Sequence, residues 1–305
     1  MSNSKSNELT NNKVTSSLMR SRERSFFLVF LLPAVLALLI VTIFPIIYGL
    51  YASLHDASLS QMGKFIGLGN YIKAFMDKSF YISLRVTFLF VIGAVTLELI
   101  LGILIAVLLH AAQFKSTIVK TLLLIPMAAT PAVVGICWRL MYDTDMGIIN
   151  YLLGVIGIPK ILWLVNPTVA LISLIIVDVW QWTPFIMLII YAGLESIPQD
   201  IYEASAIDGA GGFTRFFKIS LPLLSPLISI AVFLRAIDAY KMFDIAYITT
   251  SGGPGTSTEN ASLFAYRQGF NFFHTGYASA LAIIMLIIII LLDYFRKKSM
   301  KLFLK

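Results

Sequence analysis

The sequence predicts an all-α integral membrane protein with six transmembrane helices. Hydrophobic residues make up 58% of the 305-residue chain and charged residues only 13%, and the mean hydropathy is +0.87. A water-soluble domain cannot bury so much apolar surface. The apolar residues also gather in runs long enough to cross a hydrocarbon core of about 30 Å at about 1.5 Å per helical residue.

Six apolar runs give the expected spans, at residues 26–51, 82–110, 118–142, 168–194, 221–248 and 277–295. Residues 26–296 therefore form the expected six-helix transmembrane domain. Residues 1–25, rich in Ser and Asn, are expected to be a disordered cytoplasmic tail, and residues 297–305 a basic cytoplasmic tail. The first apolar run is too long for a signal peptide and lacks a small-residue cleavage site, so we expect it to be retained.

The distribution of basic residues sets the expected orientation. With both termini in the cytoplasm, fourteen Lys and Arg residues fall in inner segments, six in outer segments and three inside spans. This asymmetry follows the positive-inside rule and places residues 195–222, between the fourth and fifth spans, in the cytoplasm. Residues 147–165 are apolar but interrupted by glycines and a proline, so we expect a short external or re-entrant element there.

Residues 195–222 form a polar island between two apolar runs. Ser196 followed by Gln199 is a capping-box pattern and predicts a helix start, and Gly209 stands where a left-handed C-terminal cap would lie. A second short segment, 213–220, follows and ends at a proline. The pattern predicts a broken helix-turn-helix on the membrane surface, presented to a partner in water.

The same island resembles the EAA loop of the permease subunits of ABC importers. Its spacing is that of the carbohydrate (maltose-type, binding-protein-dependent) branch, except that Ser205 stands where the pattern has a second Ala. The resemblance runs from the first span to the sixth, and the island residues that carry it are Glu203-Ala204-Ser205, Asp208-Gly209-Ala210, Phe216, Ile219, Leu221-Pro222 and Pro226.

The resemblance implies a multi-pass permease of the inner (cytoplasmic) membrane that imports a carbohydrate, whether a sugar, an oligosaccharide or a related polyol or sugar derivative. Besides membrane lipid, it implies ABC ATPase subunits, a second homologous permease that completes a heterodimer, and an extracytoplasmic solute-binding protein; it implies no nucleic acid and no cofactor. ATP hydrolysis is expected in the separate ATPase, since this sequence has no G-x-x-x-x-G-K-[ST] phosphate loop. The cytoplasmic coupling (EAA) helix would contact the ATPase through Glu203, Ala204, Ser205, Asp208, Gly209 and Ala210.

Ionisable groups inside the spans are a second set of candidates, because charge is costly in hydrocarbon. The fifth span carries Arg235, Asp238, Lys241 and Asp244 at steps of three, so opposite charges can pair along one helix. Such a face either lines a polar path or neutralises itself to fix helix packing.

The fourth span offers aromatic rings and a side-chain amide, which suit the apolar face and polar edge of a sugar ring. The alternative is a pair of interfacial tryptophans beside a proline kink. The candidate solute-path residues of the two spans are Gln181, Trp182, Asp238, Tyr240 and Lys241.

Two other function classes remain open from the residues alone. A proton-coupled secondary carrier would work without ATPases and would use Glu98, Asp178 or Asp238 as its proton site. A membrane scaffold would carry no solute. The three histidines show no metal-ligand spacing, and the single Cys137 excludes a disulfide within the chain.

Overall fold

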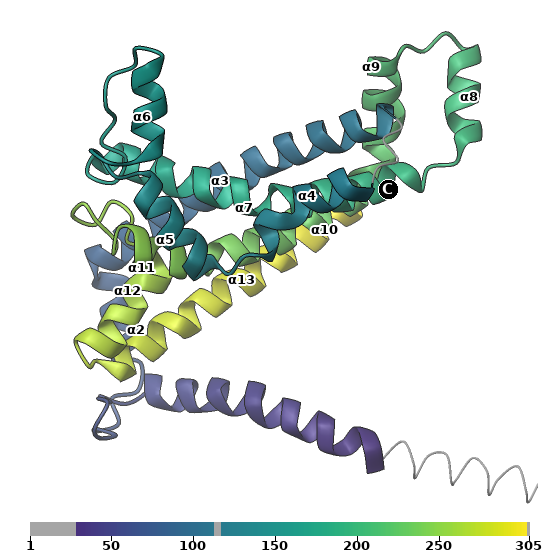
Figure 1. Cartoon of the computed structure of the whole chain (residues 1–305). Helices are drawn as coiled ribbons and strands as arrows, with labels where there is room; N and C mark the ends of the chain where they lie inside the picture. The colour runs from purple at the N-terminus through teal and green to yellow at the C-terminus, as the bar shows by residue number, and fades with distance from the viewer. Residues whose placement is uncertain (1–28, 113–116, 304–305) are drawn as a thin grey trace, which may run out of the picture.

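The computed structural model describes residues 29–112 and 117–303 (Figure 1). In these ranges the regular structure is helical, apart from one isolated bridge between His55 and Phe65. The predicted all-α class is therefore confirmed. The elements are an N-terminal helix (Val29–Ser53), α2 (Gly69–Met76), α3 (Lys78–Ala111), α4 (Thr117–Ala128), α5 (Pro131–Met141), α6 (Ile148–Val155), α7 (Pro167–Glu195), α8 (Gln199–Ile207), α9 (Gly212–Arg215), η1 (Phe216–Ser220), α10 (Leu221–Tyr240), α11 (Asp244–Thr249), α12 (Ala261–Tyr266), η2 (Arg267–Asn271) and α13 (Thr275–Phe303).

Five helical segments are long and apolar enough to cross a membrane, and six if the bent pair of α4 and α5 is one span. The second and fourth predicted spans coincide with α3 and α7 to within a few residues. The sixth predicted span, 277–295, lies inside the longer helix α13. The predicted tail, 1–25, the first three residues of the first span, and Lys115 lie outside the described residues.

The third predicted span, 118–142, is not one straight helix. Its two halves, α4 and α5, meet at 90°. Pro131 opens α5, and the residue before a proline is pushed out of the helical region; Thr130 accordingly has an extended backbone (φ −68°, ψ 140°). The main-chain groups freed at such a break need partners inside the protein.

The fifth predicted span, 221–248, begins earlier in the structure, at Gly212, and its helix is interrupted before the C-terminal end. Towards the N-terminus the helix continues back through the π-helical turn η1 into α9, so the segment 213–220 is the start of this helix rather than a separate element. Towards the C-terminus α10 ends at Tyr240, and α11 begins only at Asp244. Lys241 and Asp244 therefore do not continue the helical row that Arg235 and Asp238 begin.

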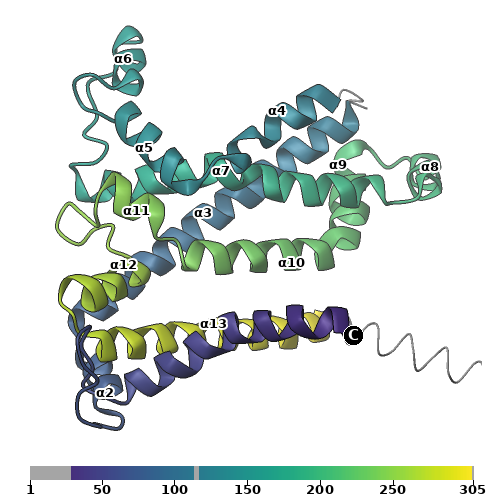
Figure 2. The ribbon, with the colours of Figure 1, turned by 60° about the horizontal axis from the view of Figure 1, so that its bottom comes forward.

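The centre of the chain is the pair α3 and α7, with α10 packed across both (Figure 2). Small residues allow the close approach. A Cβ atom added to Gly102 of α3 would lie 2.7 Å from Ile186 Cγ2 and 3.0 Å from the main-chain nitrogen of Met187, both on α7. The apolar cluster around this contact includes Ala106, Ile186, Ile190 and Leu224.

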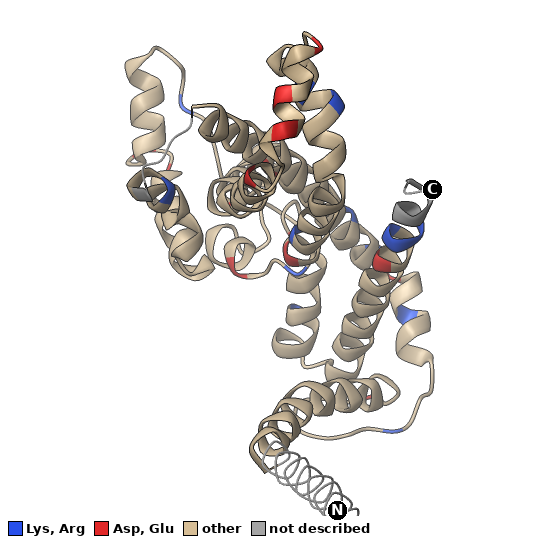
Figure 3. Cartoon of the chain, turned by 90° about the vertical axis from the view of Figure 1, so that its right-hand side faces the viewer, with Lys and Arg blue, Asp and Glu red and all other residues tan. Residues whose placement is uncertain are grey.

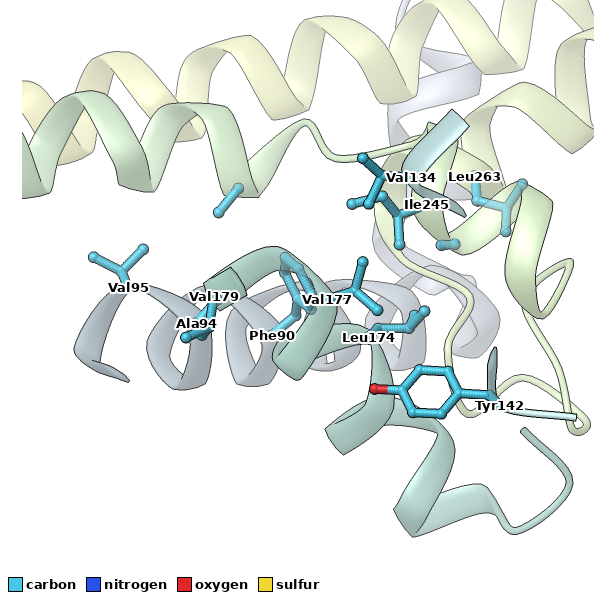
Figure 4. Close-up of a cluster of buried hydrophobic side chains, with 12 residues drawn as sticks. Phe90, Ala94, Val95, Val134, Tyr142, Leu174, Val177, Val179, Ile245 and Leu263 are labelled. Atoms are coloured by element: carbon cyan, nitrogen blue, oxygen red, sulfur yellow. The ribbon is translucent and has the colours of Figure 1, made fainter. Parts of the chain in front are cut away.

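A second cluster of buried apolar side chains includes the contact of α11 with α5 and extends to side chains of α3 and α7 (Figure 4). Phe90, Leu174, Val177 and Ile245 belong to it, together with Tyr142, whose hydroxyl donates to the carbonyl of Ser173 at 3.2 Å. This cluster holds the break between α10 and α11 next to the break between α4 and α5.

The N-terminal helix and α13 lie on the opposite side of the chain from α4 and α7 (Figure 2). The most apolar window of the N-terminal helix has no buried residue. Its last turn is tied to α2, because the Asn70 amide donates to the carbonyls of Ser53 and His55 at 2.9 Å each. A third apolar cluster, which includes Phe80, Phe264 and Leu281, joins α3, α12 and α13.

The glycine contact between α3 and α7 gives a stability prediction. Gly102→Ala forces a methyl group against a helix backbone that cannot step aside, so we expect a loss of about 1–3 kcal/mol of unfolding free energy. The matched control is Gly154→Ala in α6, where an added Cβ meets nothing within 4 Å and should be neutral or stabilising. Thermal unfolding of the two purified variants in detergent measures the difference, and equal melting temperatures would contradict this account of the packing.

Candidate functional site

The most buried basic side chain in the described part of the chain is Arg235 of α10, which is 2% exposed. Its Nε donates to Glu98 Oε2 at 2.6 Å and its Nη2 to Glu98 Oε1 at 2.8 Å, a two-pronged contact with α3. Nη2 also donates to Asp178 of α7. Glu98 is 0% exposed and Asp178 is 2% exposed. One guanidinium thus joins the three central helices.

These partners differ from the predicted pairing along one helix. Arg235 is 3.8 Å from Asp238 through Nη1, longer than its contacts across to α3 and α7. Lys241 does pair locally, with its Nζ 3.2 Å from Asp238 Oδ1. Burial of a guanidinium costs hydration free energy, which hydrogen bonds to carboxylates must offset. Because its donors form a fork, the guanidinium bonds best to carboxylates on facing helices.

A cavity of about 160 Å³ opens beside this ion network, at the break between α10 and α11. Three of the five predicted solute-path residues line it: Trp182, Asp238 and Lys241. Asp178 and Arg235 form its buried wall, and the Trp182 ring lies 5.1 Å from the guanidinium carbon of Arg235. The remaining lining residues are Pro131, Met242, Phe243, Asp244 and Ile245. The cavity therefore combines aromatic faces with half-exposed charged groups.

The other two predicted solute-path residues do not line this cavity. Gln181 is 0% exposed, and its Nε2 donates to the carbonyl of Ala129 at 2.9 Å. It thereby satisfies a main-chain group freed at the break between α4 and α5. Tyr240 lines a separate, largely apolar cavity of about 590 Å³ between α3, α10 and α13, and its hydroxyl has no partner among the described residues.

The predicted coupling residues lie on and just after α8. Gly209 has a φ of +74°, as the expected left-handed cap requires, and the N–H groups of Gly209 and Ala210 donate to the carbonyls of Ala206 and Ser205 at 3.1 and 2.9 Å. The expected capping box is wrong: Ser196 Oγ donates back to the carbonyl of Gly193 at 2.7 Å and so ends α7, while Pro198 precedes α8 without a side-chain cap.

The exposed face of α8 is acidic. Glu203, Ala204, Asp208 and Gly209 are exposed, whereas Ser205 is 5% exposed and its Oγ donates to the carbonyl of Tyr202 at 2.7 Å. Acidic positions on this helix and basic positions on the following α9–η1 segment stand at one end of the chain in Figure 3. The four exposed residues can meet a partner directly; Ser205 and the half-buried Ala210 hold the turn in shape.

Sequence reasoning missed the contacts that fasten α8 to the helix bundle. Tyr202 hydrogen-bonds Ser220 Oγ at 3.0 Å, and its ring packs 6.2 Å from that of His110 at the end of α3. His110 Nδ1 lies 3.1 Å from Glu195 Oε1 at the end of α7. The signal in the sequence is slight, because a tyrosine among polar residues looks like any exposed aromatic.

Comparison with known proteins identifies the chain's relatives. Residues 23–299 match the family model described as "Binding-protein-dependent transport system inner membrane component". The trehalose/maltose transport system permease protein MalF of Thermococcus litoralis is 37% identical, over 92% of this chain and 94% of its own. A probable ABC transporter permease of Sinorhizobium fredii is 44% identical over 86% and 85%. The sulfoquinovosyl glycerol transport system permease protein of Agrobacterium fabrum is 34% identical over 86% of each chain.

Among solved structures, a chain of a bacterial alginate ABC transporter, in complex with an alginate-bound periplasmic protein, superposes with a TM-score of 0.78. The superposition covers 91% of this chain and 94% of that one, at 20% identity. A chain of the MetNI methionine ABC transporter gives a TM-score of 0.52 over 72% of this chain and 92% of that one, at 17% identity. These likenesses show a shared fold.

Removing the buried guanidinium should cost more stability than removing any exposed charge of the cavity. We expect Arg235→Met to lower the unfolding free energy by about 3–5 kcal/mol, because it leaves Glu98 and Asp178 buried without a cation. Lys241→Met removes an exposed cation and should change it by less than about 1 kcal/mol.

Thermal unfolding in detergent is the measurement. Adding Glu98→Gln and Asp178→Asn to Arg235→Met removes the orphaned carboxylates and should recover part of the loss. If Arg235→Met and Lys241→Met unfold at the same temperature, the ion network does not hold the three helices together.

Proposed function

Because the chain belongs to the binding-protein-dependent transport system inner membrane component family, it is a permease subunit of an ABC importer, and we propose that its cargo is a carbohydrate. The observation that carries the proposal is the match to the trehalose/maltose permease over 92% of this chain. The cavity at Trp182, with aromatic faces beside half-exposed charged groups, suits a polyhydroxylated solute.

The proposed topology has six spans and both termini in the cytoplasm. In it, the bent pair of α4 and α5 counts as one span, and α8 is the cytoplasmic coupling helix between the fourth and fifth spans. The excess of basic residues in the inner segments supports this orientation. The acidic, exposed face of α8 would then meet a cleft in the ATPase, with Glu203 and Asp208 supplying charge and Ala204 and Gly209 allowing close approach.

The proposed assembly contains this chain, a second homologous permease, two ATPase subunits and an extracytoplasmic solute-binding protein. ATP hydrolysis would take place in the ATPase subunits. ATP binding would close the ATPase pair, α8 would move with it, and the spans would open the solute route to the outside. Trp182, Asp238 and Lys241 would contact the solute, while Gln181 and Tyr240 would support the helices around it.

The test is reconstitution of the assembly into liposomes with a panel of sugars. We expect the binding protein loaded with its sugar to stimulate ATP hydrolysis and to drive sugar uptake. Uptake by this chain alone, driven by a proton gradient and independent of ATP, would instead favour a secondary carrier.

The coupling role of α8 can be tested at Gly209. Its φ of +74° is closed to proline, which is fixed near −65°, so Gly209→Pro should insert normally but reduce sugar-stimulated ATP hydrolysis and uptake by about tenfold or more. The matched control is Gly211→Pro, since Gly211 has a φ of −66° that proline adopts without strain. Uptake at the wild-type rate by Gly209→Pro would remove α8 from the coupling pathway.

A further inference from the structure

The charge balance of the cavity at Trp182 bears on which carbohydrates it accepts. We propose that this cavity selects neutral sugars over anionic ones, and that Asp238 and Asp244 are the residues that exclude an anion. This inference rests on the proposed function, and it concerns the substrate class rather than the transport mechanism.

The first step is that Arg235 is not available to an anionic solute. Its Nε and Nη2 are occupied by Glu98 and Asp178, and Nη1 faces Asp238 at 3.8 Å. The side chain is 2% exposed. A carboxylate or sulfonate on a sugar would have to displace one of these partners, which would leave that partner buried without a cation.

The second step concerns the other cation of the cavity. Lys241 is 60% exposed, but its Nζ lies 3.2 Å from Asp238 Oδ1. Arg139, the one basic residue of α5, does not line the cavity; its Nη1 donates to the carbonyl of Ile248 at 3.0 Å. Among the described residues, each cation that lines the cavity therefore already has a carboxylate partner, and none is left for an anionic solute.

The third step concerns the sign of the net charge on the groups that line the cavity. Of the three carboxyl groups that line the cavity, Asp178 is bonded to the buried Arg235, as is Glu98 behind it. This leaves the half-exposed Asp238 and the exposed Asp244 against one exposed cation, Lys241. Asp244 is exposed and makes no ion pair within the described residues. An anionic group entering so small a space meets these like charges at close range.

A neutral sugar finds suitable contacts in the same place. Ionised carboxylates accept hydrogen bonds and donate none, which matches the hydroxyl donors of a sugar ring. Trp182 and Phe243 present half-buried aromatic faces for the apolar side of the ring.

The relatives do not fix the sign of the substrate's charge. One is named for trehalose and maltose, which are neutral, and another for sulfoquinovosyl glycerol, which carries a sulfonate. A further solved structure of this fold is that of a bacterial ABC transporter involved in the import of the acidic polysaccharide alginate. The sign of the substrate's charge therefore has to be inferred from the side chains that line the cavity of this chain.

The experiment measures binding to the assembled transporter in detergent without its binding protein, so that the permease is tested directly. The probes are glucose and glucuronate at millimolar concentration. The two differ only in that glucuronate has a carboxylate where glucose has a hydroxymethyl group. Saturation-transfer NMR detects their binding. We expect glucose to bind about tenfold more strongly than glucuronate. Trp182→Leu should abolish the glucose signal, which assigns it to this cavity.

The double variant Asp238→Asn, Asp244→Asn should bring glucuronate to within about threefold of glucose, because it removes two like charges and frees Lys241. The control is Asp145→Asn, an 81% exposed carboxylate that pairs with Lys160 away from the cavity, and it should leave the ratio unchanged. Since Asp238 is 42% exposed, its loss should not unfold the protein, and a melting curve verifies this.

Equal or tighter binding of glucuronate by the wild-type transporter would overturn the inference, as would a glucose signal that survives Trp182→Leu. Either result would leave the proposed function standing, because that is measured separately by sugar-stimulated ATP hydrolysis. Unchanged glucuronate binding in the double variant would likewise remove Asp238 and Asp244 as the excluding residues.

Discussion

The fold depends on one buried cation. Arg235 is separated from Glu98 by 137 positions and from Asp178 by 57, yet it contacts both. In a chain with so much apolar surface, a guanidinium without partners would be very costly, so the three helices are restricted to rotations that bring these carboxylates to it. The same rotations place Trp182, one turn beyond Asp178, and Asp238, one turn beyond Arg235, on the wall of the cavity.

The cavity exists because two helices break next to each other. A break frees main-chain groups that hydrocarbon cannot satisfy, and here side chains from other helices supply the partners. Gln181 donates to Ala129 at the break between α4 and α5, and Arg139 donates to Ile248 in α11. Polar residues within the spans thus serve two purposes: some line the cavity, and others stabilise the irregular backbone around it.

How much the sequence could predict depended on whether the information was local. The long apolar runs located α3 and α7, and Gly209 indicated the left-handed cap, because each is determined by nearby residues. The pairing of Lys241 with Asp238 was predicted for the same reason. The contacts of Arg235 with α3 and α7 could not be predicted, because the spacing of residues along one helix does not indicate which other helices pack against it. The predicted capping box at Ser196 is wrong because the Ser196 hydroxyl donates to a carbonyl of the preceding helix, α7, instead.

The helical segment from Gly212 to Tyr240 links the two candidate sites. At about 1.5 Å per residue it is about 43 Å long, with the α8 loop at one end and the cavity at the other. Tyr202 fastens α8 to this segment through Ser220, and Arg235 fastens the segment to α3 and α7. A displacement of α8 would therefore reach the cavity as a movement of packed helices. In such a movement Arg235, Glu98 and Asp178 stay together, since separating them would leave a buried charge without a partner. The cavity would change shape mainly at Asp238, Lys241 and α11, which are less tightly held.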